Sequence, residues 1–305
     1  MKKLTLIAFL ILAALPAYCD GTGTLISWPG WIVSSTENIY MGYKHTSFPL
    51  TYLFDGDANT AWVFSGKGKK IDGSASGYAI TITREWEKKP VTMDSIWIMN
   101  GYNKSTELFL RNNRITQLKL YINSKFVKTV TLTDSMGWHK ISIPRQPVKE
   151  IELHFTAFAK GRDNDICVSG LALYDRGKRI DLKMPRAVEY TDGDGDCGCG
   201  QSWYMIDRTG KKLINYDAES PSVLSPSGRY AANVQNSKLL VLDTSTGKIV
   251  MRQTITRDKE TRSEIDRWKD EHSIVISIDK YTPDKTEDSG YKTDSYTKTI
   301  KITKR

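Results

Sequence analysis

The 305-residue sequence predicts an all-β protein, and two observations lead to this prediction. Helical periodicity is almost absent, whereas short runs of β-branched and aromatic residues recur between turn-forming residues. The chain also contains 15 Tyr and 8 Trp, whose amphipathic rings suit the half-buried faces of strands.

The N-terminus predicts export. Two lysines precede an apolar run from Leu4 to about Ala17 that ends among small residues, the pattern of a secretory signal peptide over residues 1–19. This run is shorter than the ~20 apolar residues of a membrane span, and no later stretch approaches that length. We therefore expect a periplasmic, secreted or surface-attached protein. An ordinary cleaved signal is favoured over a lipoprotein acylated on Cys19, because Tyr18 is too bulky for the position before a lipidated cysteine.

The net charge of +9 indicates a solvated basic surface. Lysines and arginines are scattered among acids without a dense basic run, and export argues against nucleic acid as a partner. Weak attraction to an anionic envelope is compatible with this charge. Four cysteines give no disulfide framework. Cys167 lies in an apolar alternation and is expected to be a small buried hydrophobe.

After the signal, about 285 residues remain, more than one core usually serves, so we expect two domains. The first spans residues 24–182 and contains about eight strand-like runs. In the run 117–122, Leu118, Leu120 and Ile122 alternate with other residues, which puts one face in a core and one in solvent. Strands of this number and spacing, separated by turns, fit a two-sheet jelly-roll β-sandwich.

Two motifs within this domain carry a resemblance to a known family. The segment 53–62 contains an Asp-Gly-Asp turn followed by Thr-x-Trp, and the segment 98–105 contains an Asn-Gly-Tyr loop. An Asn-Asn-Arg sequence at 112–114 and a strand follow this loop. Over residues 31–175 the order of these motifs resembles the NADase-type glycan-binding domain, a discoidin-like (F5/8 type C, galactose-binding-like) module. That module precedes the catalytic part of a streptococcal NAD glycohydrolase and also occurs in exported bacterial proteins without that enzyme.

The resemblance implies a glycan site at one rim of the sandwich. Sugar recognition needs a flat apolar platform and planar polar side chains in a preformed site. Each candidate also has a structural alternative, since asparagines cap turns and an arginine can pair with an acid. The predicted ligand-binding residues are Tyr102, Lys104, Asn112, Asn113, Arg114, Arg162, Asp163 and Asp165.

A structural Ca²⁺ against the Asp-Gly-Asp loop is a further implication, because relatives of this fold often hold one there. Its ligands would include Asp55 and Asp57. However, Gly170 stands where an acid is expected on the closing strand, and turn capping accounts for both aspartates. Turn capping is therefore the favoured interpretation, and no other cofactor is predicted.

Residues 183–201 predict a flexible, acidic linker. Alternating aspartates at 192, 194 and 196 mimic the start of an EF-hand loop, but position 12 is Trp203 instead of Glu. Cys197 and Cys199 lack two further ligands for a zinc site, and free thiols or longer-range pairing stay open.

Residues 202–305 predict a small antiparallel β domain made of propeller-blade-like hairpins. The segment 239–250 forms one such hairpin and resembles the edge of a WD40-type blade. Too few residues follow for the four blades that a closed propeller needs. The last strand, 296–303, is rich in Thr and Lys, which suits an edge strand protected by charge.

The sequence predicts no enzyme. It contains no G-x-S-x-G, H-E-x-x-H, Walker or dinucleotide-binding motif, and its four histidines are isolated. The leading hypothesis is an exported, non-catalytic glycan-binding protein of the bacterial cell envelope or surface. The first alternative is a protein-interaction scaffold of the envelope that makes contact through residues 202–305. The second is an unrecognised hydrolase that uses Asp163 and Asp165.

Overall fold

The computed structural model describes residues 24–35, 48–65, 78–85, 88–163, 165–193, 201–215, 223–235, 237–256, 260–283 and 291–302. Within these ranges the chain is almost entirely antiparallel β-structure, which confirms the predicted fold class. The one α-helix of the described residues is α2 (Thr106–Arg111), and a 3-10 turn, η2 (Leu50–Leu53), precedes the Asp-Gly-Asp loop. No helix of this part of the chain has the length and apolar character needed to cross a membrane.

The larger sheet of the sandwich contains nine strands. They are β1 (Thr24–Trp28), β2 (Trp31–Ser35), β4 (Tyr78–Arg84), β6 (Arg114–Ile122), β7 (Lys125–Thr131), β9 (Glu150–Ala159), β12 (Ala187–Gly193), β13 (Gln201–Asp207) and β14 (Lys212–Asn215). Their order across the sheet is β14-β13-β12-β1-β2-β4-β9-β6-β7.

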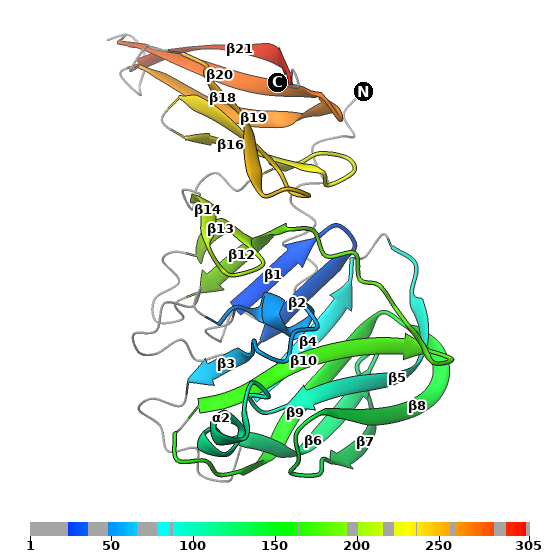
Figure 1. Cartoon of the computed structure of the whole chain (residues 1–305). Helices are drawn as coiled ribbons and strands as arrows, with labels where there is room; N and C mark the ends of the chain where they lie inside the picture. The colour runs from blue at the N-terminus through cyan, green and yellow to red at the C-terminus, as the bar shows by residue number, and fades with distance from the viewer. Residues whose placement is uncertain are drawn as a thin grey trace.

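The smaller sheet faces the larger one across the core (Figure 1). Its strands are β3 (Trp62–Ser65), β5 (Val91–Asn100), β8 (Trp138–Val148), β10 (Asp165–Asp175) and β11 (Lys178–Arg179), in the order β11-β10-β5-β8 with β3 paired to β10. The predicted alternation is observed, since Leu118, Leu120 and Ile122 all lie in this core. Each such side chain contributes roughly 1.5–3 kcal/mol through burial. The jelly-roll sandwich is therefore confirmed.

Part of the predicted linker is a strand of the sandwich. Ala187–Gly193 forms β12, which pairs with β1 on one side and with β13 on the other. Val188 and Tyr190 point into the sandwich core and are almost completely buried. The strand escaped prediction because only these two apolar residues alternate before the aspartates begin. Residues 194–200, with both cysteines and two of the aspartates, lie outside the described residues, as does the predicted signal peptide.

The second half of the chain forms two further antiparallel sheets. One contains β15 (Val223–Leu224), β16 (Tyr230–Gln235), β17 (Lys238–Asp243) and β18 (Lys248–Thr254), in this order. The other contains β19 (Thr261–Asp270), β20 (Ser273–Pro283) and β21 (Tyr291–Lys301). The predicted hairpin over 239–250 is confirmed as β17 and β18, and the Thr- and Lys-rich β21 is an edge strand as expected. The WD40-type likeness is not confirmed.

These sheets stack on the sandwich layer by layer (Figure 1). One face of the four-stranded sheet shares a core with β19–β21, to which Tyr230 and Leu239 contribute. Its other face packs through Leu242 against Met205 and Ile214 of β13 and β14. Strand β13 is thus covered on both faces, because its Ile206 lies in the sandwich core. The division predicted at residue 202 does not coincide with a change of sheet, and independent domains remain a prediction.

Candidate functional site

Three loops meet at one end of the sandwich, and we call residues 55–60, 100–105 and 133–138 together the rim. The hydroxyl of Tyr102 donates to the carbonyl of Asn59 at 3.3 Å, which joins the first two loops. The amide of Gly137 donates to Oδ1 of Asn103 at 2.7 Å, which joins the second loop to the third. The two motifs that carried the resemblance are therefore in contact.

The Asp-Gly-Asp loop is closed by its own carboxylates. Oδ1 of Asp55 accepts the amide of Asp57 at 2.9 Å, and Oδ2 accepts the hydroxyl of Thr60 at 2.7 Å. Oδ1 of Asp57 accepts both the amide and the side-chain NH₂ of Asn59 at 2.8 Å. Partial burial raises the pKa of Asp55, whereas the bonds from Asn59 lower the pKa of Asp57. Gly56 has φ +76°, which the sharp turn requires.

This loop does not fit a carboxylate-held Ca²⁺. In the described ranges, no three His, Cys, Asp or Glu side chains lie close enough together to hold a metal ion. Both aspartates already accept hydrogen bonds from their own turn, as the favoured interpretation expected. Binding of a calcium ion at the rim stays a prediction, which the melting temperature with added calcium tests.

The Asn-Gly-Tyr loop turns sharply because Gly101 allows it. Its φ is +76°, and a Cβ at this position would lie 2.6 Å from Cδ2 of Phe109. Asn103 then fixes the loop: its amide donates to Oγ of Ser169 at 2.9 Å, and its side chain donates to the carbonyl of Asn100 at 2.6 Å. Asn103 was not among the predicted site residues, although its place directly after Gly-Tyr marked it as a turn residue.

Of the predicted residues in this loop, Tyr102 and Lys104 lie at the rim surface. Lys104 is exposed, and Tyr102 is half-buried with its hydroxyl on the neighbouring loop. Burial raises the pKa of the Tyr102 phenol, so this donor keeps its proton at physiological pH. Both side chains are accessible to a ligand.

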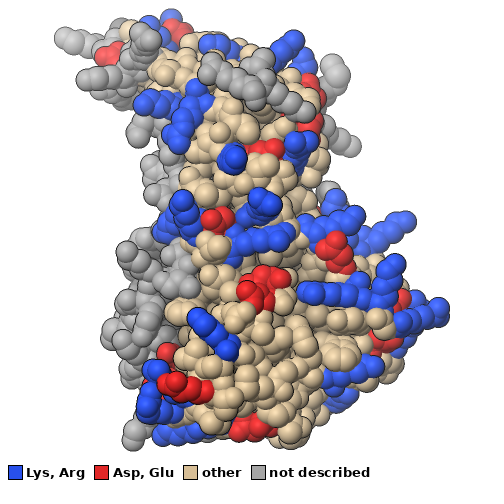
Figure 2. Space-filling model, in the orientation of Figure 1, with Lys and Arg blue, Asp and Glu red and all other residues tan. Residues whose placement is uncertain are grey.

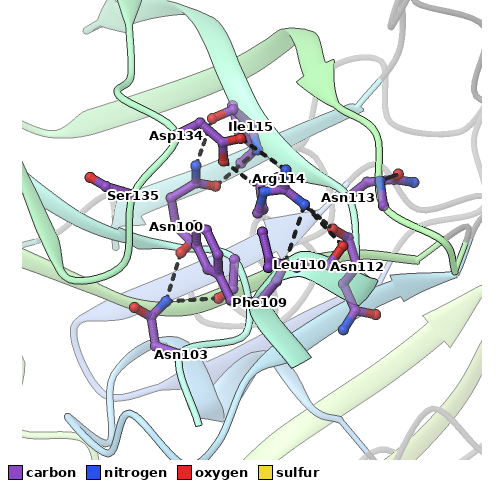
Figure 3. A network of polar contacts seen from close by, with 12 residues as sticks. Asn100, Asn103, Phe109, Leu110, Asn112, Asn113, Arg114, Ile115, Asp134 and Ser135 are labelled. Carbon is purple, nitrogen blue, oxygen red and sulfur yellow. Dashed lines mark hydrogen bonds and ion pairs between the residues drawn. The ribbon is translucent and has the colours of Figure 1, made fainter. Parts of the chain in front are cut away.

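Arg114, which was predicted to contact a ligand, instead lies in a network of polar contacts with Asp134 and Asn112 (Figure 3). It is 5% exposed, and its Nε and Nη2 donate to the two carboxylate oxygens of Asp134 at 2.6 and 2.8 Å. Its Nη1 donates to the carbonyl of Asn112 at 2.8 Å. The hydrogen bonds from Arg114 to Asp134 lower the pKa of the Asp134 carboxyl group. Arg114 therefore holds the third loop of the rim from inside.

The two asparagines before it are also internal. Asn112 donates to the carbonyl of Leu108 at 2.7 Å, and Oδ1 of Asn113 accepts the amide of Gly161 at 2.9 Å. Both are less than 10% exposed. Both were predicted to contact a ligand, but their polar atoms support α2 and the late loop instead.

The late loop packs against α2 instead of the rim. Asp163 accepts two hydrogen bonds from the guanidinium of Arg111, at 3.0 and 2.8 Å. Arg162 extends into solvent, and the carbonyl of Asp165 accepts the amide of Asn113. The arrangement favours a structural role for Asp163 over acid/base chemistry, since its carboxylate is held in an ion pair.

The most exposed aromatic residue of the rim is Trp138, which was not among the predicted site residues. Trp138 lies opposite Met99 across β8 and β5, and the benzo part of its indole lies against Gly170 of β10. The ring is 36% exposed, and Met136 beside it in the same loop is 40% exposed. The position where an acid was expected is thus a glycine covered by an indole. The sequence feature that could have indicated this exposed ring is a Trp directly after a turn glycine, Gly137.

Next to this ring, the outer face of the smaller sheet is aromatic and carries little charge. The rings of Trp97 and Tyr174 are 5.4 Å apart, and Nζ of Lys140 lies 6.0 Å from the Trp97 ring. Figure 2 shows a broad area without charged side chains on this side of the sandwich. Cys167, also on β10, is buried as predicted, and burial raises the pKa of its thiol.

Comparison with known proteins confirms the resemblance that the motifs indicated. Residues 31–174 match the family model described as NAD glycohydrolase translocation F5/8 type C domain. The sandwich is similar to this family. No curated relative matches the chain.

Solved structures similar to this F5/8 type C-like sandwich are remote. A family 32 CBM from C. perfringens NanJ, in complex with galactose, is 18% identical, with a TM-score of 0.35 over 50% of this chain and 99% of that one. The family 32 carbohydrate-binding module from Streptococcus pneumoniae EndoD is 12% identical, with a TM-score of 0.36 over 50% and 99%. SpGH29 is 12% identical, with a TM-score of 0.32 over 48% of this chain, which spans only 27% of SpGH29.

Proposed function

We propose that the chain is an exported, non-catalytic glycan-binding protein of the bacterial cell envelope or surface, and that the rim around Trp138 is its binding site. The observation that carries this proposal is the exposed indole held against Gly170, at the end of an F5/8 type C-like sandwich. The apolar face of a sugar ring packs on such a platform, while nearby polar groups recognise its hydroxyls.

The polar partners of the platform come from the neighbouring loops of the rim. Lys104 is free to reach a ligand, and Tyr102 presents a half-buried ring beside the Asp-Gly-Asp loop. The Arg114–Asp134 pair and Asn103 fix both loops from inside. The site is therefore preformed, which reduces the ordering cost of binding.

The absence of catalysis is also part of the proposal. Of the two carboxylates that the hydrolase alternative would use, those of Asp163 and Asp165, the first is held in an ion pair with Arg111. Export is supported by the N-terminal sequence alone.

A glycan array with residues 24–305, followed by calorimetric titration of any hit, tests the proposal. Trp138→Ala is expected to weaken binding, by about 1–3 kcal/mol if one ring of a stacked pair is lost, as for bases stacked on aromatic side chains. The matched control is Tyr296→Ala, because Tyr296 is an exposed aromatic residue on β21, outside the rim. Silence across neutral and acidic glycans by a folded protein would contradict the proposal, as would equal losses in both variants.

One observation favours a second candidate, the envelope scaffold. Strand β21 is an edge strand 11 residues long, and Tyr296 on it is 54% exposed. Such an edge can pair with a strand of a protein partner. A pull-down with residues 24–305 that is lost with Tyr296→Ala but kept with Trp138→Ala would support this function.

A further inference from the structure

A groove borders the Asp-Gly-Asp loop of the rim. It is a groove of about 340 Å³ between β10, the segment 179–184 that follows β11, and Arg208 at the end of β13. A Cβ at Gly56 would lie 3.6 Å from the guanidinium of Arg179, so the groove borders the loop whose Asn59 contacts Tyr102.

Positive charge dominates the groove. Three cations line it, Arg179, Lys183 and Arg208, against the single carboxylate of Asp181. One oxygen of that carboxylate accepts the amide of Lys183 at 2.8 Å, where the backbone has φ +51°. Figure 2 shows Lys and Arg side chains gathered across this face, where the sandwich meets the upper sheets.

The cations differ in how firmly they are held. Arg208 is fixed, because its Nε donates to the carbonyl of Pro185 at 3.0 Å and its Nη2 donates to the carbonyl of Met184. Arg179 and Lys183 are exposed, and among the described residues no carboxylate pairs with either side chain. Their charges are therefore available to an anion from solution.

The remaining wall is apolar and rigid. The ring of Phe54 lines the groove and packs edge-on against Trp28, with ring centroids 6.1 Å apart. The rest of the apolar lining comes from Leu171, Ala172, Leu173, Ile180, Leu182 and Met184. A ring-shaped ligand with one anionic group matches this combination, since its apolar face can pack on Phe54 while its anion meets the cations.

We propose that this groove binds the acidic unit of a glycan through a carboxylate or sulfate group. This inference rests on the proposed function for the class of ligand, but it uses a different set of residues. Arg179 recognises the anion in a bidentate manner, Lys183 adds a second charge, and Arg208 holds the floor of the groove in place.

Isothermal titration of residues 24–305 with three probes tests the inference: a galacturonate oligomer for the carboxylate, a sulfated galactose oligomer for the sulfate, and a galactose oligomer as the neutral reference. Arg179→Gln and Lys183→Gln are each expected to weaken binding of at least one acidic probe roughly tenfold. The matched control is Lys178→Gln, which removes the same charge from the adjacent β11 residue outside the groove lining. It is expected to change the affinity by about twofold at most.

Two results would overturn the inference: no binding of either acidic probe, or equal weakening by all three variants, which would indicate diffuse surface attraction. Melting temperatures confirm that each variant is folded. The test of the rim as a glycan site is independent of the test of the groove. Neutral binding that depends on Trp138 without acidic binding removes only the groove, whereas acidic binding that depends on Arg179 without any effect of Trp138→Ala removes only the rim.

Discussion

The indole of Trp138 lies so close to Gly170 that a Cβ there would be 2.8 Å from Cη2 and 3.4 Å from Cζ2 of the ring. The two residues are 32 positions apart, and β5 lies between their strands. Glycine at position 170 therefore determines where the platform of the rim lies, because any side chain there displaces the indole.

Gly170→Ala is expected to weaken glycan binding about as much as Trp138→Ala does. The added methyl group pushes the far end of a half-exposed side chain aside, so the unfolding free energy should fall by less than the roughly 1–3 kcal/mol typical of overpacked cores. Titration and thermal melting of the same variant check this. Unchanged affinity with a displaced ring would show that the indole is not the platform.

The ring and the hydroxyl of Tyr102 can be separated by two substitutions. Tyr102→Phe removes the bond to the Asn59 carbonyl, and because this bond is exposed the loss of stability should be near the low end of about 0.5–1.5 kcal/mol. Its ring remains, so glycan affinity should change little. Tyr102→Ala removes the ring as well and should lower the affinity further. Equal affinity in both variants would exclude the ring from the site.

The Arg114–Asp134 pair should give the fold an acid-dependent stability. Hydrogen bonds from Arg114 lower the pKa of Asp134 in the folded protein, so the contribution is complete above the unfolded value of about 3.9. It is lost as the pH falls through the lower folded pKa. Asp134→Asn should cost about 1–2 kcal/mol at pH 7, less than the roughly 3–5 kcal/mol of fully buried pairs, because Asp134 is 40% exposed.

Urea unfolding between pH 7 and pH 2 measures both effects. The difference between the wild type and Asp134→Asn should narrow as the pH falls below about 4. A difference that stays constant over this range would show that the ion pair contributes nothing to the acid dependence.

Calcium should leave the melting temperature unchanged. The carboxylates of Asp55 and Asp57 accept hydrogen bonds from Asp57, Thr60 and Asn59, and no further acid joins them to form a cluster among the described residues. A bound ion would stabilise the fold in proportion to the logarithm of its concentration over Kd. A rise in melting temperature with added CaCl₂, reversed by EDTA, would contradict this expectation.

Sequence patterns predicted the parts of the fold that depend on local order. The alternation around Leu118 and the turns near Gly56 and Gly101 identified strands and loops, and the shared motif order identified the two loops that Tyr102 joins. These features follow from residues that are neighbours in the chain.

The missed features depend on distant pairing. Arg114 was predicted to contact a ligand, with pairing to an acid as its structural alternative, but the sequence did not identify Asp134, 20 residues later, as that acid. Predicting the exposed ring of Trp138 as a platform would have required the sheet order, in which β8 and β10 flank β5 and bring Trp138 over Gly170. Such contacts are set by sheet order, which one sequence does not reveal.

Strand β12 leads to a last prediction, which concerns where the chain can be cut. A fragment of residues 24–182 follows the boundaries predicted from the sequence, but besides Met184 it lacks the three residues Val188, Tyr190 and Ile206, which β12 and β13 contribute to the sandwich core. It also leaves the β1 edge, which β12 covers, exposed to solvent.

Three large side chains at roughly 1.5–3 kcal/mol each are comparable to the 5–15 kcal/mol that stabilises a typical protein, so this fragment should melt well below residues 24–305 or aggregate. A fragment of residues 24–216 is the control, because it keeps β12, β13 and β14 and restores all three core residues. Circular dichroism melts and size-exclusion chromatography compare the three proteins. If residues 24–182 melt at the same temperature as residues 24–305, the sandwich is complete without β12, and the boundary predicted from the sequence is the correct one.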